Sequence, residues 1–161
     1  MVRLVMTLTL AVAALTIRLL AQSMSSSYAV VVHRSNPISS IRLTDLRAMF
    51  WGEIKQWPDG RKLVLVERDL QSHAFRFLMQ HVLNTTAVEY QRRLANMEFK
   101  GETPVTMRIL NSDAAACKFV FNVPGSIALI STNSLALPEC SAVQLVVVDG
   151  KLPGEDQYRL R

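Results

Sequence analysis

The chain has 161 residues, half of them hydrophobic, and a formal net charge of +5 at pH 7. This size suits one domain with a single hydrophobic core. Lysine and arginine are scattered along the chain rather than gathered in a patch with aromatic residues, which argues against a nucleic-acid-binding surface. Nucleophile elbows, phosphate-cradling glycine loops and helices with paired metal ligands are missing from the sequence, which therefore predicts no enzyme, no cofactor and no metal site.

The N-terminal segment has the order of features that is typical of a signal peptide. Arg3 supplies a positive charge, and Leu4–Ile17 is almost wholly apolar but shorter than the roughly 20 residues that span a bilayer. Ala21-Gln22-Ser23 follows with the small residues that a signal peptidase accepts. We therefore predict a signal peptide over residues 1–23 and a periplasmic or secreted domain over residues 24–161, with membrane contact only through the signal. The alternative is an uncleaved membrane anchor.

The domain is predicted to begin with a strand and a short helix. Tyr28–His33 is rich in β-branched residues and predicts a buried strand, which the turn-forming Ser35-Asn36-Pro37 ends. A loop then leads to a helix that ends before Gly52, with Thr44 as its N-cap. The apolar stripe of this helix comprises Leu43, Leu46, Met49 and Phe50.

A second strand and two helices are predicted next. Trp57-Pro58-Asp59-Gly60 is a turn signal, and Leu63–Val66 predicts the strand after it, with Arg68 just past its end. A helix beginning near Ser72 follows, because apolar residues recur there at helical spacing. Those residues are Phe75, Leu78, Met79, Val82 and Leu83. Thr86 and Glu89 form a capping-box pattern that begins the second helix.

The rest of the chain continues the alternation of strands and helices. Val105–Leu110 predicts a strand, and Asn111-Ser112-Asp113 can cap the helix that follows it. Val123-Pro124-Gly125 ends that helix, and Ser126–Ile130 and Val143–Val148 predict two more strands. This alternation favours an α/β sandwich with a mostly buried sheet.

Cys117 and Cys140 are the only cysteines in the sequence. An exported protein enters a compartment in which disulfides persist, so the two can pair. Two separate buried thiols are the alternative, since the spacing does not require a bridge. The three histidines are dispersed and make no familiar zinc site with the cysteines.

Four stretches resemble the phosphate-type periplasmic solute-binding proteins of ABC transporters. The strand that ends in an asparagine-proline turn is similar to one of the family's strands, and the next helix with its glycine, the tryptophan turn and a proline-glycine strand entry also resemble the family. These stretches are Val30–Pro37, Leu43–Gly52, Trp57–Gly60 and Pro124–Ile130, and Asp149-Gly150, Pro153 and Tyr158 resemble the family's tail.

This resemblance implies an α/β fold, namely a single lobe of the type II periplasmic-binding-protein fold, with a mixed sheet flanked by helices. Complete members of the family clamp their ligand between two lobes, whereas this chain has room for one. The implied function is the binding of phosphate or a related oxyanion for ABC-type uptake or sensing, with an ABC permease or another exported protein as partner.

The family's anion site is a serine-glycine-threonine run at a helix N-terminus, with an arginine four residues before the serine. Arg68 and Ser72 keep that spacing, while His73 and Ala74 replace the glycine and threonine, and Leu70 replaces an acidic residue. A serine beside the free N–H groups of a helix start and an arginine nearby can hold an oxyanion.

We expect Ser35 and Asn36 to join Arg68 and Ser72, because loops that follow strands can meet at one end of a sheet. The alternative for Arg68 and Ser72 is structural, with Ser72 as a simple N-cap and Arg68 as an ion-pair partner of Glu67 or Asp69. The alternative function is an exported protein-interaction domain that keeps the lobe as a scaffold and binds no anion.

Overall fold

The computed structural model describes residues 27–100, 102 and 105–161, so the predicted signal peptide lies outside the described residues. The described strands form one six-stranded sheet with the order β2-β6-β1-β5-β3-β4. β1 runs antiparallel to its neighbours β5 and β6, whereas every other neighbouring pair in this sheet is parallel. The strands are β1 Tyr28–Val32, β2 Ser40–Ile41, β3 Val64–Arg68, β4 Thr106–Leu110, β5 Ser126–Ser131 and β6 Gln144–Val148.

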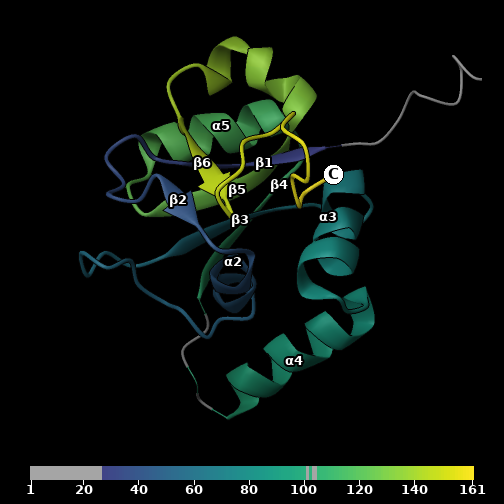
Figure 1. The fold of residues 1–161 in the computed structure, drawn as a ribbon. Helices are drawn as coiled ribbons and strands as arrows, with labels where there is room; N and C mark the ends of the chain where they lie inside the picture. The colour runs from purple at the N-terminus through teal and green to yellow at the C-terminus, as the bar shows by residue number, and fades with distance from the viewer. Residues whose placement is uncertain (1–26, 101, 103–104) are drawn as a thin grey trace, which may run out of the picture.

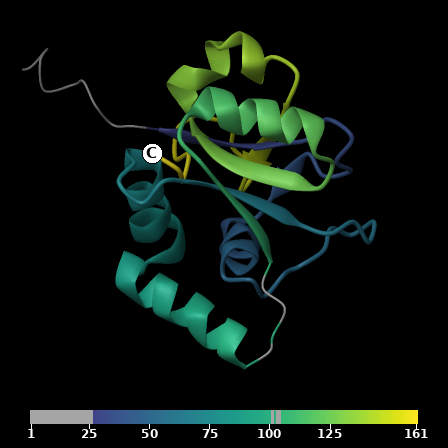
Figure 2. The same cartoon turned by 180° about the vertical axis from the view of Figure 1, so that it is seen from behind.

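Helices cover both faces of this mixed sheet, as predicted (Figures 1 and 2). α2, α3 and the π-helix η1 pack on one face, and α5 with the 3₁₀-helix η3 packs on the other. α4 extends away from the sheet below α2 in the view of Figure 1. The helices are α2 Leu43–Phe50, α3 His73–Phe77, η1 Leu78–Leu83, α4 Ala87–Phe99, α5 Asp113–Asn122, η2 Thr132–Ala136 and η3 Pro138–Cys140. None of the helices in the described part of the chain is long and apolar enough to cross a membrane.

The central strand β1 separates two hydrophobic cores, since successive side chains of a strand point to opposite faces of a sheet. Val30 and Val32 contact the larger core beneath α2 and α3, whereas Ala29 and Val31 contact the smaller core beneath α5. All five residues of β1 are buried. This burial on both faces explains the unbroken apolar run that predicted the strand.

The residues with helical spacing after β3 form one continuous helix, which consists of α3 and the π-helical segment η1. All five apolar residues of the predicted stripe are buried, which confirms the helix and the face that it presents. From Leu78 to Leu83 the helix is a π-helix, and it ends at Asn84, whose φ of 51° lies in the left-handed region. The predicted capping box is also confirmed, because Thr86 Oγ1 accepts from the Glu89 N–H and Glu89 accepts from the Thr86 N–H.

Two local predictions before Trp51 are wrong. The N-cap of α2 is Arg42 rather than Thr44, and it makes no side-chain capping bond. Instead, the Leu43 N–H donates to the Asp149 carboxylate, 3.0 Å away and far along the chain. The predicted loop before this helix also contains β2, whose two residues pair with the end of β6. Both features depend on the segment around Asp149, which the local sequence does not reveal.

Two of the stretches that resemble the solute-binding family meet at the amino edge of the parallel strands. The indole N–H of Trp57 donates to the carbonyl of Gly125 at 2.7 Å, and the Val64 N–H donates to the same carbonyl at 3.0 Å. Gly125 has a φ of 91°, which favours glycine, and a Cβ at this position would overlap the backbone carbonyl oxygen of Lys62. The tryptophan turn and the proline-glycine turn therefore hold the entries of β3 and β5 together.

Replacing Gly125 with alanine is expected to lower the free energy of unfolding by about 2 kcal/mol. The positive φ contributes about 1 kcal/mol of this loss, and overlap of the new Cβ with the Lys62 carbonyl oxygen contributes the remainder. Gly154→Ala is a matched control, because Gly154 has a φ of 93° but open space around its Cα. Urea denaturation curves of both variants measure the difference, and equal losses would show that the Lys62 contact is unimportant.

Candidate functional site

The carboxyl ends of β3, β4 and β5 lie at one edge of the sheet, because these strands are parallel. Arg68 is the last residue of β3, Asn111 and Ser112 follow β4, and Ser131 ends β5. Ligands of open α/β folds usually bind outside this edge. This edge is therefore the candidate site.

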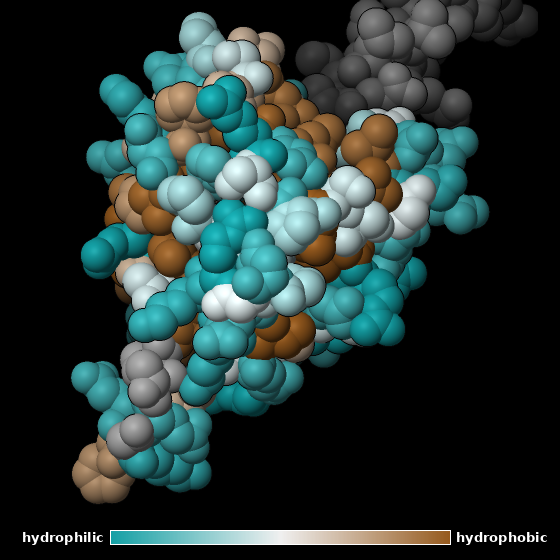
Figure 3. Space-filling view, turned by 90° about the vertical axis from the view of Figure 1, so that its left-hand side faces the viewer, coloured by the Kyte–Doolittle hydropathy of each residue, from teal (hydrophilic) through white to brown (hydrophobic). Residues whose placement is uncertain are grey.

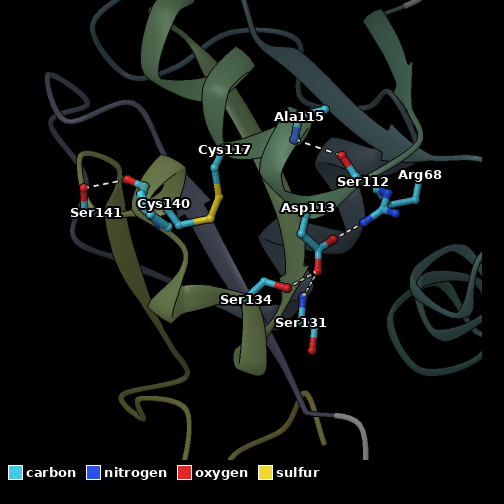
Figure 4. The surroundings of a disulfide bond; sticks show 10 residues. Arg68, Ser112, Asp113, Ala115, Cys117, Ser131, Ser134, Cys140 and Ser141 are labelled. Atoms are coloured by element: carbon cyan, nitrogen blue, oxygen red, sulfur yellow. Dashed lines mark hydrogen bonds and ion pairs between the residues drawn. A yellow bond between two sulfur atoms is a disulfide. The ribbon is translucent and has the colours of Figure 1, made fainter.

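Arg68 is fixed at this edge by groups that follow β4. Its guanidinium donates to the carbonyls of Leu110 at 3.1 Å and Asn111 at 2.7 Å, and it forms a hydrogen-bonded ion pair with Asp113 (Figure 4). The arginine and aspartate side chains are only 14% and 12% exposed. Arg68 is therefore an ion-pair partner, as its structural alternative expects, but the partner is Asp113 rather than Glu67 or Asp69.

Asp113, the first residue of α5, is the centre of the polar network at the edge. One carboxylate oxygen pairs with Arg68, and the other accepts from the Ser131 N–H at 3.1 Å and the Ser134 hydroxyl at 2.7 Å (Figure 4). Ser112 caps the same helix, since its hydroxyl accepts from the Ala115 N–H at 3.1 Å. A carboxylate at a helix N-terminus is also stabilised by the helix dipole. The chain thus supplies its own anion to Arg68.

A disulfide on the α5 face holds this network in position. Cys117 of α5 and Cys140 of η3 are bonded, with their Cα atoms 5.0 Å apart, and both side chains are buried (Figure 4). The bridge joins α5 to the short helices that follow β5. Because Ser134 lies in η2, directly before η3, the bridge restrains the segment from which Ser134 reaches Asp113.

Ser72 is the N-cap of α3. Its hydroxyl accepts from the Phe75 N–H at 3.0 Å and donates to the Asp69 carbonyl at 2.7 Å. Asp69 in turn accepts from the Gln71 N–H. Both Ser72 contacts are local to the turn, as the structural alternative for this serine describes. Leu70, at the position where the resembling family carries an acidic residue, is 45% exposed.

Ser35 and Asn36 do not join Arg68 and Ser72, and this part of the predicted site is wrong. β1 is antiparallel to β5, and β5 is parallel to β3, so the loop after β1 lies at the opposite end of the sheet from the end of β3. Ser35 instead accepts from Arg61 at 2.9 Å. Asn36 is buried and its side-chain oxygen accepts from the Ile38 N–H, which is a turn contact.

The C-terminal segment crosses the carboxyl edge beside β1. The Tyr28 N–H donates to the Leu160 carbonyl at 2.7 Å, and the Tyr158 hydroxyl donates to the Tyr28 carbonyl at 2.8 Å. Burial raises the pKa of the Tyr158 hydroxyl, which keeps it protonated as a donor. A cavity of about 420 Å³ separates this segment from the start of η2, and Thr132 and Arg161 are among its lining residues. The C-terminal segment therefore covers part of the carboxyl edge of the sheet.

No group of acidic, histidine or cysteine side chains within the described residues could hold a metal ion.

The sequence analysis did not identify Asp113 as the partner of Arg68, although it identified the residue as part of a helix cap. The order of elements could have indicated this partner. A helix that follows β4 begins at the same edge of the sheet as the end of β3, if β3 and β4 are parallel neighbours.

Similar folds occur among solved structures. A protein of Clostridium perfringens named as a phosphate ABC transporter substrate-binding protein, with bound phosphate, superposes with a TM-score of 0.60 at 20% identity. PstS from Borrelia burgdorferi gives 0.63 at 16%, and an ABC-type phosphate transport receptor from Vibrio cholerae gives 0.55 at 17%. These matches cover 79%, 80% and 80% of this chain, but only 46%, 49% and 48% of the respective neighbours.

The fold is that of one lobe of a phosphate-type substrate-binding protein. The chain spans about half the length of these neighbours, which confirms the single-lobe prediction for the fold. The neighbours are binding proteins rather than enzymes. No family model matches the sequence, and no curated protein matches it.

Proposed function

We propose that the chain is an exported binding domain, periplasmic or secreted, that takes a phosphate-like oxyanion at the carboxyl edge of β3–β5. The observation that carries the proposal is the fixed guanidinium of Arg68 at this edge. A guanidinium has five N–H donors. Among the residues that the structure describes, Arg68 uses three of them on Leu110, Asn111 and Asp113, which leaves two N–H groups on a side chain whose orientation is already set.

The affinity of this site for an anion is low in the single lobe. Asp113 already balances the charge of Arg68, and an incoming oxyanion meets the negative charge of that carboxylate. An arginine–oxyanion contact that is open to water contributes only about 1 kcal/mol. A second lobe, an ABC permease or another exported protein that covered the edge would lower the local dielectric constant and strengthen the contact.

The second candidate function is an exported protein-interaction domain that uses the lobe as a scaffold. The specific observation in its favour is the same ion pair, because Arg68 has its counter-ion within the chain and requires none from a solute. The replacement of the family's glycine and threonine by His73 and Ala74 agrees with this candidate. Titration with phosphate distinguishes the two functions.

Phosphate added to the purified domain is expected to give weak binding that depends on Arg68. Arg68→Ala should abolish the heat of binding in isothermal titration, whereas Asp113→Asn should raise the affinity about tenfold by removing the neighbouring negative charge. Arg93→Ala is the control, because Arg93 lies on α4 and pairs with Glu53 away from the site. Equal heats from wild type and Arg68→Ala, or none from any protein including Asp113→Asn, would favour the interaction domain.

A further inference from the structure

α4 is joined to the rest of the domain by an ion pair of Arg93 with Glu53, by the same guanidinium over the Trp51 ring and by a narrow apolar face. Tyr90 is the single buried residue of this helix, and Ala87, Leu94 and Met97 are only partly buried. A groove of about 520 Å³ separates α4 from the end of α2, between Arg93 and Met97 on one side and Trp51 and Gly52 on the other. The lower projection in Figure 3, beside the grey residues of the loop that follows α4, is mostly hydrophilic.

The Tyr90 side chain enters the core and ends at a buried carboxyl group. Its ring contacts Trp51 and Phe75, with ring centroids 5.6 Å and 6.4 Å away. Its hydroxyl donates to Glu67 and lies 3.4 Å from the carbonyl oxygen of Phe50. Glu67 is 3% exposed, on the face of β3 opposite to Arg68.

Within the described part of the chain, no lysine, arginine or histidine balances the charge of the Glu67 carboxylate. Tyr90 of α4 is the titratable group that faces it, and α2 contributes only the Phe50 carbonyl. The register partner of Glu67 on β4 is Ile109, and the α3 residue against the Tyr90 ring is Phe75, so the nearest side chains of both elements are apolar. A lone carboxylate in such surroundings is costly to ionise.

The connection before α4 can serve as a hinge. Asn84 adopts the left-handed conformation at the end of the π-helix, and the chain turns there before Thr86 caps α4. π-helical turns inside α-helices are frequent at functional sites. Rotation at this point would withdraw the Tyr90 ring and open Glu67 to water.

From this arrangement we infer that α4 undocks from the domain as pH rises through neutrality, with Glu67 as the group that releases it. Burial raises the pKa of Glu67 from 4.5 to about 7, although the Tyr90 hydrogen bond lowers it. Once α4 has undocked, Glu67 is in water and its pKa returns toward 4.5. The docked state is therefore most stable below about pH 5 and loses stability until pH exceeds 7. The released helix exposes the Trp51 and Phe75 rings.

Hydrogen exchange measured between pH 5 and pH 8 tests this release. After correction for intrinsic exchange rates, the protection of α4 amides is expected to fall by up to about 70-fold between the two pH values, while α5 amides keep theirs. Glu67→Gln should abolish the fall, because its amide stays neutral and still accepts from Tyr90. Tyr90→Phe should lower α4 protection at both pH values without removing the fall.

Glu98→Gln is the matched control, since Glu98 is an exposed carboxylate of α4. It should keep the wild-type profile. The inference is overturned if wild-type α4 is equally protected at pH 5 and pH 8, or if α4 and α5 lose protection together. It is also overturned if the fall persists in Glu67→Gln. If Glu67→Gln fails to fold, the pH dependence of α4 and α5 protection in the wild type still tests the inference.

Discussion

Asp113→Ala is expected to lower the free energy of unfolding by about 3–5 kcal/mol. The change removes the ion-pair partner of Arg68 and leaves a nearly buried guanidinium without its counter-ion. It also leaves the Ser131 N–H and the Ser134 hydroxyl without their acceptor. Urea denaturation at pH 7 measures the loss.

Two companion variants show whether the buried charge causes this loss. Lys118→Ala removes a charge from an exposed position of the same helix and should change stability by less than about 0.5 kcal/mol. Arg68→Met combined with Asp113→Leu replaces both charges by apolar groups of similar size, and it should recover most of the stability. A double variant as unstable as Asp113→Ala would show that the ion pair itself stabilises the domain.

The removal of the disulfide is expected to cost about 3–4 kcal/mol. Cys117 and Cys140 are 23 residues apart in sequence, and cross-links that close loops of this length stabilise by about 3 kcal/mol in the chain-entropy model. Both positions are buried in the core beneath α5, so Cys117→Ala with Cys140→Ala also loses sulfur packing. Denaturation curves with and without a reducing agent measure the effect on the wild type.

The double alanine variant is its own control, because a reducing agent should not change its unfolding curve. Since the bridge holds the segment that carries Ser134, its loss should also increase hydrogen exchange at Ser131, whose N–H donates to Asp113. A wild-type protein whose stability does not change on complete reduction would contradict the structural role of the bond. Protection in α4 should be unaffected, since α4 packs on the other face.

The predicted ion-pair partner of Arg68 shows what local sequence cannot decide. The sequence placed a candidate ion pair on Glu67 or Asp69, the charged neighbours of Arg68. Alternation along β3 sends the Glu67 side chain to the α4 face and Arg68 to the α5 face, so adjacent residues of the strand cannot pair. The partner is Asp113, 45 residues away, which the parallel pairing of β3 and β4 brings to the same edge.

By itself the sequence determined most of the helices and strands, because periodicity and most capping are local, but it missed β2 and the N-cap of α2. The stripe from Phe75 to Leu83, the capping box at Thr86 and the apolar strands form as predicted, and the single-lobe fold was implied by the resemblance of four stretches to the solute-binding family. These features depend on residues within a few positions of one another, and local rules describe such features well.

Only the tertiary structure decided which residues share the site. The direction of β1 places Ser35 and Asn36 at the far end of the sheet, and strand direction is fixed by pairing with β5 and β6 rather than by the residues of β1. The start of α2 is satisfied by Asp149, and Glu67 is buried because Tyr90 arrives from a separate helix. Each of these contacts joins residues distant in sequence, so its geometry exists only after the chain has folded around both cores.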